Sequence, residues 1–242
     1  MKKALLLFIA LFLLVASGTT SAFADSWALW DWSVNVNGTT YDAGATPGSV
    51  NTSGYDFGTG LGSVVMSFNG TGSETAGIYA YLFYDTGFGI DLSTASGSVN
   101  GSPKAGLSYG LAWPAVPDAS NLTLFDKFST NALDNSNSVS TYSPPPDACC
   151  SVAFSENFNF TLPPGFAGKV KYEITTTAPT SGFYLQITDA QNNQSVYLVE
   201  SDSQTPTGGT TTPEPASLLL LGSGFAGLWA RRRWFGGRRN RS

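Results

Sequence analysis

The chain has 242 residues, a formal net charge of −5 and no histidine. Without histidine it cannot use a Ser-His triad, a histidine general base or histidine metal ligands. It also contains no P-loop, no dinucleotide-binding fingerprint and no CxxC motif, so nothing in it indicates nucleotide-dependent or dithiol chemistry.

Charge is distributed unevenly along the chain. All 17 acidic residues lie between Asp25 and Glu214, whereas eight of the 12 basic residues lie near the two ends. The segment between the ends keeps four lysines and therefore has a formal charge of −13. Those lysines are Lys104, Lys127, Lys169 and Lys171. Because phosphate binding requires lysine and arginine, this segment predicts no nucleic-acid partner and favours an exported, soluble domain.

The first 24 residues have the pattern of a secretory signal peptide. Two lysines follow the initial methionine, and residues 4–16 are apolar without interruption. Ala22-Phe23-Ala24 is a small-x-small cleavage site, which predicts that the mature chain begins at Asp25. The alternative is an uncleaved membrane anchor. In both cases residues 1–24 serve targeting rather than the fold.

Residues 25–202 have the length and composition of one all-β domain. Glycine, serine, threonine and asparagine are abundant, and short apolar–polar alternations are separated by turn residues. The expected strands are 27–36, 61–68, 78–84, 107–113, 122–128, 152–162, 170–174, 183–187 and 196–199. About nine or ten strands at this spacing predict an antiparallel β-sandwich of jelly-roll type.

The first expected strand is rich in tryptophan. Alternation places Trp30 and Trp32 in phase with Val34 and Val36, which predicts that all four side chains face the core. Asn37-Gly38 follows directly and predicts a tight hairpin turn.

Aromatic side chains also suggest carbohydrate binding. Flat rings stack on sugar faces, and Trp27 and Trp113 are the candidates for such a platform, with Tyr79 and Tyr81 as neighbours. The competing interpretation is that these rings fill the core of the sandwich, as aromatic residues usually do.

Glu156 interrupts the apolar face of the strand 152–162. The other even positions of this strand are all apolar, namely Val152, Phe154, Phe158, Phe160 and Leu162. A carboxyl group among aromatic rings is a candidate for a perturbed pKa, unless a bulge or a strand end returns it to water. A glycoside hydrolase would need a second carboxyl group facing it across a cleft, which the sequence does not place.

Oxygen-rich turns offer two weak calcium candidates. Asp85 and Asp91 flank residues 86–90, which resemble a turn between strands. The second candidate is the set Asp134, Asn135 and Asn137 in a polar, then proline-rich segment, residues 131–147, which predicts a long surface loop. Neither has the spacing of a known calcium loop, so we expect no cofactor, with calcium as the exception to test.

Cys149 and Cys150 are adjacent and are the only cysteines of the chain. In an oxidising compartment they could form a vicinal disulfide, pair between chains or remain thiols. Adjacent cysteines cannot join distant parts of a fold, so a structural or incidental role is favoured over redox chemistry.

The C-terminal part follows a fixed order of segments. Residues 203–212 read as a flexible linker, and Pro213-Glu214-Pro215 is stiff and extended because each proline restricts its own φ and the preceding residue. Residues 216–230 carry no charge and predict a membrane-seeking helix. Arg231, Arg232 and Arg233 then begin an arginine-rich tail, 231–242, which would hold the helix end on the cytoplasmic side.

This order resembles the PEP-CTERM sorting signal of bacterial exported proteins. The resemblance covers residues 213–242 and implies recognition and processing by an exosortase, a membrane-embedded protease, near residues 213–215. It implies an inner-membrane-anchored precursor that reaches the cell surface or the extracellular matrix. It says nothing about the activity of the domain ahead of it.

Taken together, the sequence predicts an exported structural or adhesive β-sandwich that is not an enzyme. Two alternatives remain: a carbohydrate-binding module for matrix polysaccharide, and a secreted hydrolase acting through carboxylates. The ligand of the domain, extracellular polysaccharide or another partner, is not specified by the residues.

Overall fold

The computed structural model describes residues 26–85, 95–113, 117, 119–139, 151–189 and 193–207. These residues form strands and one short helix, and the expected all-β class is confirmed. The elements are β1 Ser26–Val36, β2 Thr39–Asp42, β3 Val50–Asp56, β4 Leu61–Phe68, β5 Gly72–Asp85, β6 Ala95–Asn100, β7 Leu107–Ala112, α2 Leu124–Ser129, β8 Ser136–Asn137, β9 Ser151–Leu162, β10 Phe166–Thr175, β11 Tyr184–Asp189 and β12 Gln194–Pro206.

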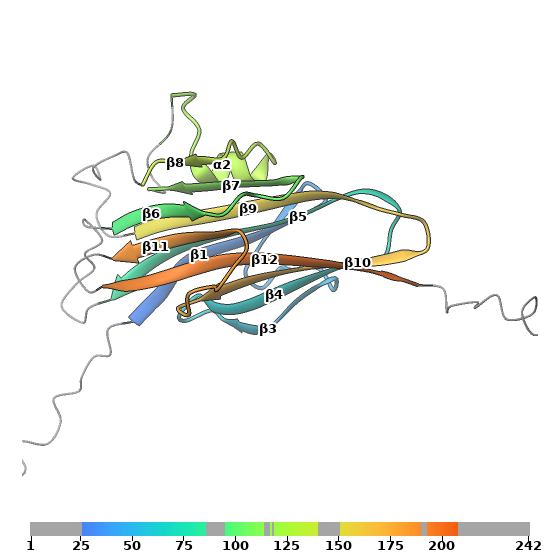
Figure 1. The fold of residues 1–242 in the computed structure, drawn as a ribbon, viewed down its shortest axis with the longest axis horizontal. Coiled ribbons are helices and arrows are strands. Elements are labelled where there is room, and N and C mark those ends of the chain that lie inside the picture. Colours follow the sequence, from blue (N-terminus) through green and yellow to red (C-terminus); the bar gives the residue numbers. More distant parts are fainter. Residues whose placement is uncertain are drawn as a thin grey trace, which may run out of the picture. The chain divides into compact units, whose positions relative to one another are not determined.

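The strands form two six-stranded sheets (Figure 1). Sheet A has the order β2-β1-β5-β9-β7-β8, and sheet B has the order β3-β4-β10-β12-β11-β6. The β1–β5, β5–β9 and β4–β10 ladders are antiparallel, whereas β7 and β8 make a two-residue parallel contact. Because β5 and β9 are neighbours although four elements separate them in the chain, the sheets are interleaved by crossovers. Whether the connectivity is that of a jelly roll stays a prediction.

The two sheets share one hydrophobic core. Buried side chains of both sheets form a single cluster that includes Val34 and Phe154 of sheet A and Val64 and Ile187 of sheet B. Ring contacts cross between the sheets, with the centroids of Phe68 and Phe160 5.2 Å apart and those of Trp32 and Tyr55 5.6 Å apart. The described residues therefore form a sandwich of two facing sheets, as alternation predicted.

Alternation and turn chemistry explain most strands. In β4 the buried positions are Val64, Met66 and Phe68, every second residue, as expected for a strand with one face on the core. Asn37 and Gly38 connect β1 to β2 with φ values of 54° and 80°. Both residues tolerate positive φ, so the expected two-residue hairpin turn is confirmed.

The expected position of Trp30 in the core is wrong. A β-bulge lies at this residue, because the β1–β5 pairing runs from Leu29 opposite Leu82 directly to Asp31 opposite Tyr81. The extra residue reverses the phase of the strand. Trp27 and Trp32 can therefore both face the core although one is odd and the other even, while Trp30 is 65% exposed.

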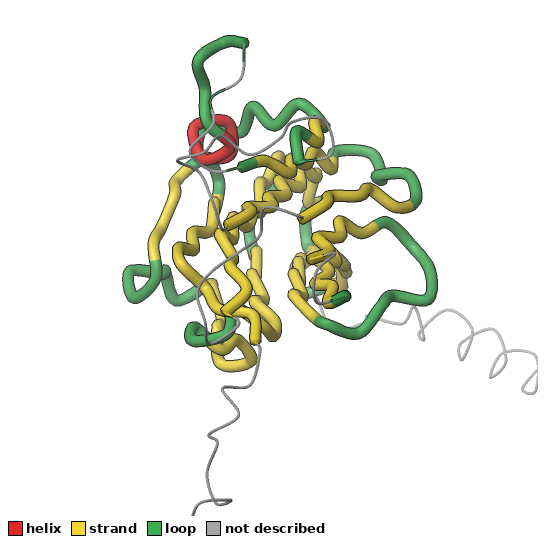
Figure 2. The backbone as a smooth tube through the Cα atoms, turned by 90° about the vertical axis from the view of Figure 1, so that its left-hand side faces the viewer, coloured by secondary structure: helices red, strands yellow, loops and turns green. Residues whose placement is uncertain are grey.

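The segment 122–128, expected as a strand, instead contains the helix α2. Thr123 is its N-cap: the Thr123 side chain accepts a hydrogen bond from the Asp126 amide, and the Asp126 carboxylate accepts one from the Thr123 amide. This capping box favours a helix start over a strand. The described structure contains this one helix beside the strands (Figure 2). It packs on the outer face of sheet A, where Phe125 and Phe128 contact Tyr79.

Other differences concern the length of elements. The expected strand 196–199 lies in the first half of β12, which continues to Pro206 and so occupies the first four positions of the expected linker 203–212. The expected loop 131–147 contains β8 within its described part. Strands β2, β3 and β6 were not expected, because their mostly polar sequences show little apolar alternation.

Candidate functional site

Glu156 lies in the middle of β9 and faces the core. In sheet A it pairs with Ile78 of β5 on one side and Tyr109 of β7 on the other, and neither ladder shifts register there. No bulge therefore returns the carboxyl group to solvent, and Glu156 is 0% exposed. The alternative that a bulge or strand end brings this side chain to water is wrong.

The Glu156 carboxyl group is isolated from hydrogen-bond donors. Within the described residues neither of its two oxygens has a hydrogen-bond partner. Burial raises the pKa of Glu156 well above its usual value, the negative charge of Glu200 raises it further, and Lys104 partly opposes the shift. An unpaired buried carboxylate is costly, so burial favours the neutral, protonated form of Glu156.

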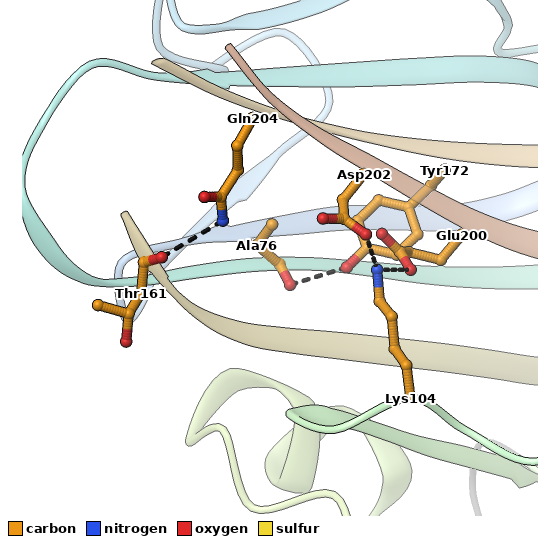
Figure 3. Close-up of polar contacts among 7 residues, drawn as sticks. All are labelled: Ala76, Lys104, Thr161, Tyr172, Glu200, Asp202 and Gln204. Atoms are coloured by element: carbon orange, nitrogen blue, oxygen red, sulfur yellow. Dashed lines mark hydrogen bonds and ion pairs between the residues drawn. The ribbon is translucent and has the colours of Figure 1, made fainter. Parts of the chain in front are cut away.

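The charges nearest to Glu156 come from the opposite sheet and from a connection between the sheets. Lys104, in the β6–β7 connection, places its Nζ 2.6 Å from Glu200 Oε2 and also binds Asp202 (Figure 3). The same Nζ lies 3.6 Å from the centroid of the Phe158 ring. Lys104 therefore fastens the β6–β7 connection to β12 and rests on an aromatic ring of β9.

Glu200 extends the buried acidic group toward the surface. Its side chain is 2% exposed, and among the described residues its second oxygen, Oε1, has no hydrogen-bond partner. Burial raises the pKa of Glu200 and Asp202 adds to the rise, while the hydrogen bond and charge of Lys104 lower it. We call Lys104, Glu156, Glu200 and Asp202 the carboxyl cluster.

Tyr172 of β10 joins the carboxyl cluster to the sheet packing. It is fully buried, and its hydroxyl donates a 2.8 Å hydrogen bond across the sandwich to the carbonyl oxygen of Ala76 in β5 (Figure 3). Burial, followed by the charges of Glu156 and Glu200, raises the pKa of Tyr172 well above its usual value. The phenol therefore stays protonated and acts as a fixed donor between the sheets.

The carboxyl cluster can store a proton but cannot meet a substrate as it stands. Glycoside hydrolases also use two carboxyl groups, often with a raised pKa, but those groups must contact the sugar in an open cleft. Glu156 is fully buried, and the solvent side of Glu200 is covered by Lys104. The arrangement fits a structural ion pair backed by a protonated acid.

A pocket of about 530 Å³ lies beside α2, outside sheet A. Trp113, Leu122 and Leu124 contribute to its apolar wall, and Lys127 and Asp134 lie at its polar side. Lys127 Nζ is 2.6 Å from Asp134 Oδ2. Burial tends to raise the pKa of Asp134, but hydrogen bonds from Lys127 and Ser136 hold it below its usual value. The charged groups of this pocket thus neutralise each other.

The sugar platform expected at Trp27 and Trp113 is not present as an exposed surface. Trp27 is 3% exposed and Trp113 is 1% exposed, so both rings belong to the core, as the competing interpretation held. Tyr79 is buried beneath α2. Trp30, which sequence alternation assigned to the core, is the tryptophan that faces solvent.

The calcium candidates receive little support from the described residues. Asp85 ends β5, and Asp91 lies outside the described residues. In the other candidate, Asp134 binds Lys127, Asn135 accepts a hydrogen bond from the Tyr109 amide, and Asn137 donates one to Gly97. No group of three or more aspartate, glutamate or cysteine side chains is placed to hold a metal ion within the part of the chain that the structure describes.

Several predicted sites lie outside the described residues. They are the signal-cleavage residues Ala22, Ala24 and Asp25, the cysteines Cys149 and Cys150, the motif Pro213, Glu214 and Pro215, the helix 216–230 and the arginines Arg231, Arg232 and Arg233. Across the ranges that are described, no helix combines the length and apolar character needed to cross a bilayer.

Comparison with known proteins identifies the C-terminal segment. Residues 211–233 match the PEP-CTERM protein-sorting motif, as the resemblance found in the sequence predicted. This motif marks an exported protein whose membrane-anchored precursor is processed by an exosortase. No curated protein and no solved structure matches the chain.

Proposed function

From the sorting motif at residues 211–233, we propose that this protein is a structural or adhesive component of the cell surface or extracellular matrix. In this proposal the β-sandwich is the functional domain, and the C-terminal segment is the sorting signal that directs its export. The motif match is the observation on which the proposal rests, because it connects an acidic β domain to a dedicated export route.

The described domain supports a structural role. Its two sheets share one aromatic-rich core, and the Lys104 ion pairs fasten a connection between the sheets to β12. The acid at its centre, Glu156, is enclosed rather than displayed in a cleft. A closed, negatively charged sandwich is suited to persist outside the cell and to remain soluble there.

In this proposal the targeting segments act in sequence. The signal peptide, residues 1–24, directs export, and the helix 216–230 with its arginines holds the precursor in the inner membrane. An exosortase then acts near Pro213-Glu214-Pro215, and the domain leaves the membrane for the surface, where extracellular polysaccharide is the expected neighbour. The proposed mature protein has no enzymatic activity and no cofactor.

Cell fractionation combined with intact-mass analysis tests the sorting step. We expect the wild-type surface product to lack the arginine tail 231–242. In a Pro213→Ala/Pro215→Ala variant we expect a membrane-bound precursor that retains this tail. Thr207→Ala, ahead of the matched motif, is the control and should be processed as wild type. A wild-type surface product that still carries the arginines would contradict the proposal.

The hydrolase alternative can be tested separately. The exported protein is incubated with neutral and acidic polysaccharides, with and without calcium, and reducing ends are measured. We expect no release above that of Glu156→Gln. Release that depends on Glu156 would show that the cluster opens to substrate and would replace the structural proposal with an enzymatic one.

A further inference from the structure

The bulge in β1 turns one tryptophan toward solvent. Trp30 is 65% exposed, and in the described part of the chain the other exposed large apolar side chains are Phe57 at 42% and Leu122 at 40%. The bulge is what exposes it, because the same residue in an unbroken strand would share the buried face of Trp32. Since β-bulges re-aim side chains next to functional sites, Trp30 is a candidate binding position.

Trp30 does not stand alone. Its ring centroid lies 6.1 Å from that of Tyr81, with 34° between the ring planes, and 5.9 Å from that of Phe83, with 74° between the planes. Tyr81 and Phe83 occupy alternate positions of β5 and point away from the core, whereas Leu82 between them is fully buried. We call Trp30, Tyr81 and Phe83 the Trp30 surface.

Polar groups border the Trp30 surface. Asp31 is exposed and lies directly opposite Tyr81 in the β1–β5 ladder, so their side chains are neighbours on the outer face of sheet A. The Tyr81 hydroxyl accepts a 2.7 Å hydrogen bond from Ser151 Oγ. The surface therefore combines an apolar ring face with a carboxylate and hydroxyl groups at its edge.

The outer face of sheet A is covered unequally. At Tyr79 the side chains of Phe125 and Phe128 from α2 lie over the sheet, with ring centroids 5.2 and 5.8 Å away. Two residues further along β5, at Tyr81, the aromatic row continues to Trp30 and is exposed there. The helix thus protects one end of this row and leaves the other available to a ligand.

We propose that the Trp30 surface binds a neutral polysaccharide by stacking a sugar ring on the indole. A sugar ring offers an apolar C–H face to an aromatic plane, and its hydroxyl groups can hydrogen-bond to the exposed Asp31 and to the Tyr81 hydroxyl, which the buried Ser151 orients. This binding adds an activity to the structural role and does not depend on the sorting step.

Charge and size favour this ligand over other partners. The exported segment carries a formal charge of −13, which repels acidic polymers. A stable protein interface buries about 800 Å² on each partner, far more than three rings provide. A narrow, uncharged polymer matches the surface better, because one sugar ring needs only a small aromatic contact and meets no charge repulsion.

Affinity electrophoresis of the full chain in a non-ionic detergent tests the proposal. The gels contain dextran, hydroxyethyl cellulose or galactomannan as neutral probes, and alginate as the acidic probe. We expect retardation by at least one neutral polymer and none by alginate. Trp30→Ala should weaken that retardation at least tenfold, and Trp30→Phe should weaken it less because a ring remains.

Phe57→Leu is the matched control, because it removes another exposed ring from a different part of the fold. Its retardation should equal that of wild type. The unfolding midpoint of each variant confirms that the fold is retained.

Several results of the electrophoresis would overturn the proposal. These are no retardation in the three neutral gels, retardation by alginate alone, Trp30→Ala binding within twofold of wild type, or equal losses in Trp30→Ala and Phe57→Leu. A change of oligomeric state in Trp30→Ala without a change in sugar binding would also overturn it, because the surface would then serve a second copy of the chain.

Discussion

Glu156→Gln replaces a buried acid by an uncharged side chain of nearly the same size, and it isolates the proton that the carboxyl cluster holds. Burial and Glu200 raise the pKa of Glu156 above the usual value of 4.5. Between 4.5 and its folded-state pKa, the folded protein keeps a proton that the unfolded chain releases. The folded state then binds more protons, so the free energy of unfolding must fall as pH rises.

The size of this effect follows from one proton. A difference of one bound proton changes the free energy of unfolding by about 1.4 kcal/mol per pH unit. Glu156 contributes this slope at pH values between 4.5 and its pKa in the folded protein. Glu200 contributes a slope of the same sign, because its pKa is also raised. Asp56, Asp126 and Asp134 have lowered pKa values, so their contributions have the opposite sign and are complete below this window.

The chain contains no histidine, so no imidazole group adds its own titration to the pH dependence of stability between pH 4 and pH 8. Urea unfolding of the full chain in detergent, followed by tryptophan fluorescence from pH 4 to pH 8, gives the stability at each pH. We expect wild-type stability to decline above pH 4.5 and Glu156→Gln to decline less steeply, by up to about 1.4 kcal/mol per pH unit. The variant should become the more stable protein at the alkaline end.

Glu173→Gln serves as the control. Glu173 is about half exposed and pairs with Lys171 at 2.6 Å, so its removal should change stability by less than about 1 kcal/mol and leave the pH dependence unchanged. The reasoning fails if wild-type stability is flat or rises between pH 5 and pH 8. It also fails if Glu156→Gln declines as steeply as wild type.

Three further outcomes are expected from unfolding measurements on single variants. Lys104→Met leaves Glu200 buried without its cation and should lower the free energy of unfolding by about 1–3 kcal/mol at pH 7. This loss is smaller than for a fully buried ion pair, because Lys104 is one-third exposed. The loss should shrink at pH 4, and an equal loss at both pH values would contradict the pairing. Thr123→Ala removes the cap of α2 and should cost about 1 kcal/mol, whereas Thr123→Ser should retain most of it. Trp32→Ala should cost about 3–5 kcal/mol and Trp30→Ala less than about 0.5 kcal/mol, and comparable losses would show that the bulge is misplaced.

Strands with one face on the core could be predicted, because apolar residues recur at every second position along them. β4 has the bounds expected from alternation, and the Asn37-Gly38 turn could be predicted because few residues accept positive φ. Strands β3 and β6 could not be predicted, since their mostly small and polar residues show little apolar alternation and pairing with neighbouring strands fixes them. Tertiary contacts supplied what local sequence did not.

In β1, one extra residue at a β-bulge makes the assignment of tryptophan side chains to strand faces by alternation wrong. Alternation across β1 correctly places Trp32 in the core, but it assumes an unbroken count and so assigns Trp30 the same face. The same count would put Trp27 on the opposite face, whereas its ring is buried in the core. A bulge has no strong sequence signature, and only the pairing with β5 reveals it.

The carboxyl cluster was partly visible in the sequence. Glu156 was found because it breaks an apolar phase, and the same criterion applied to β12 would have found Glu200, which continues the phase of Val196 and Leu198. Lys104 carries no such signal, because it lies in a connection and meets its partners only when the two sheets close. Distances between strands remote in sequence decide which carboxyl groups interact.

The scarcity of cations explains why this cluster keeps a protonated acid instead of a second ion pair. The exported segment has four lysines against 17 acidic residues, and three of these lysines, Lys104, Lys127 and Lys171, already bind carboxylates. Lys104 already forms ion pairs with Glu200 and Asp202, so the buried Glu156 has no cation bound to it among the described residues. Keeping the proton is then the remaining way to avoid an unpaired charge between the sheets. In a chain of this composition, the pH of the surroundings therefore acts directly on the core of the sandwich.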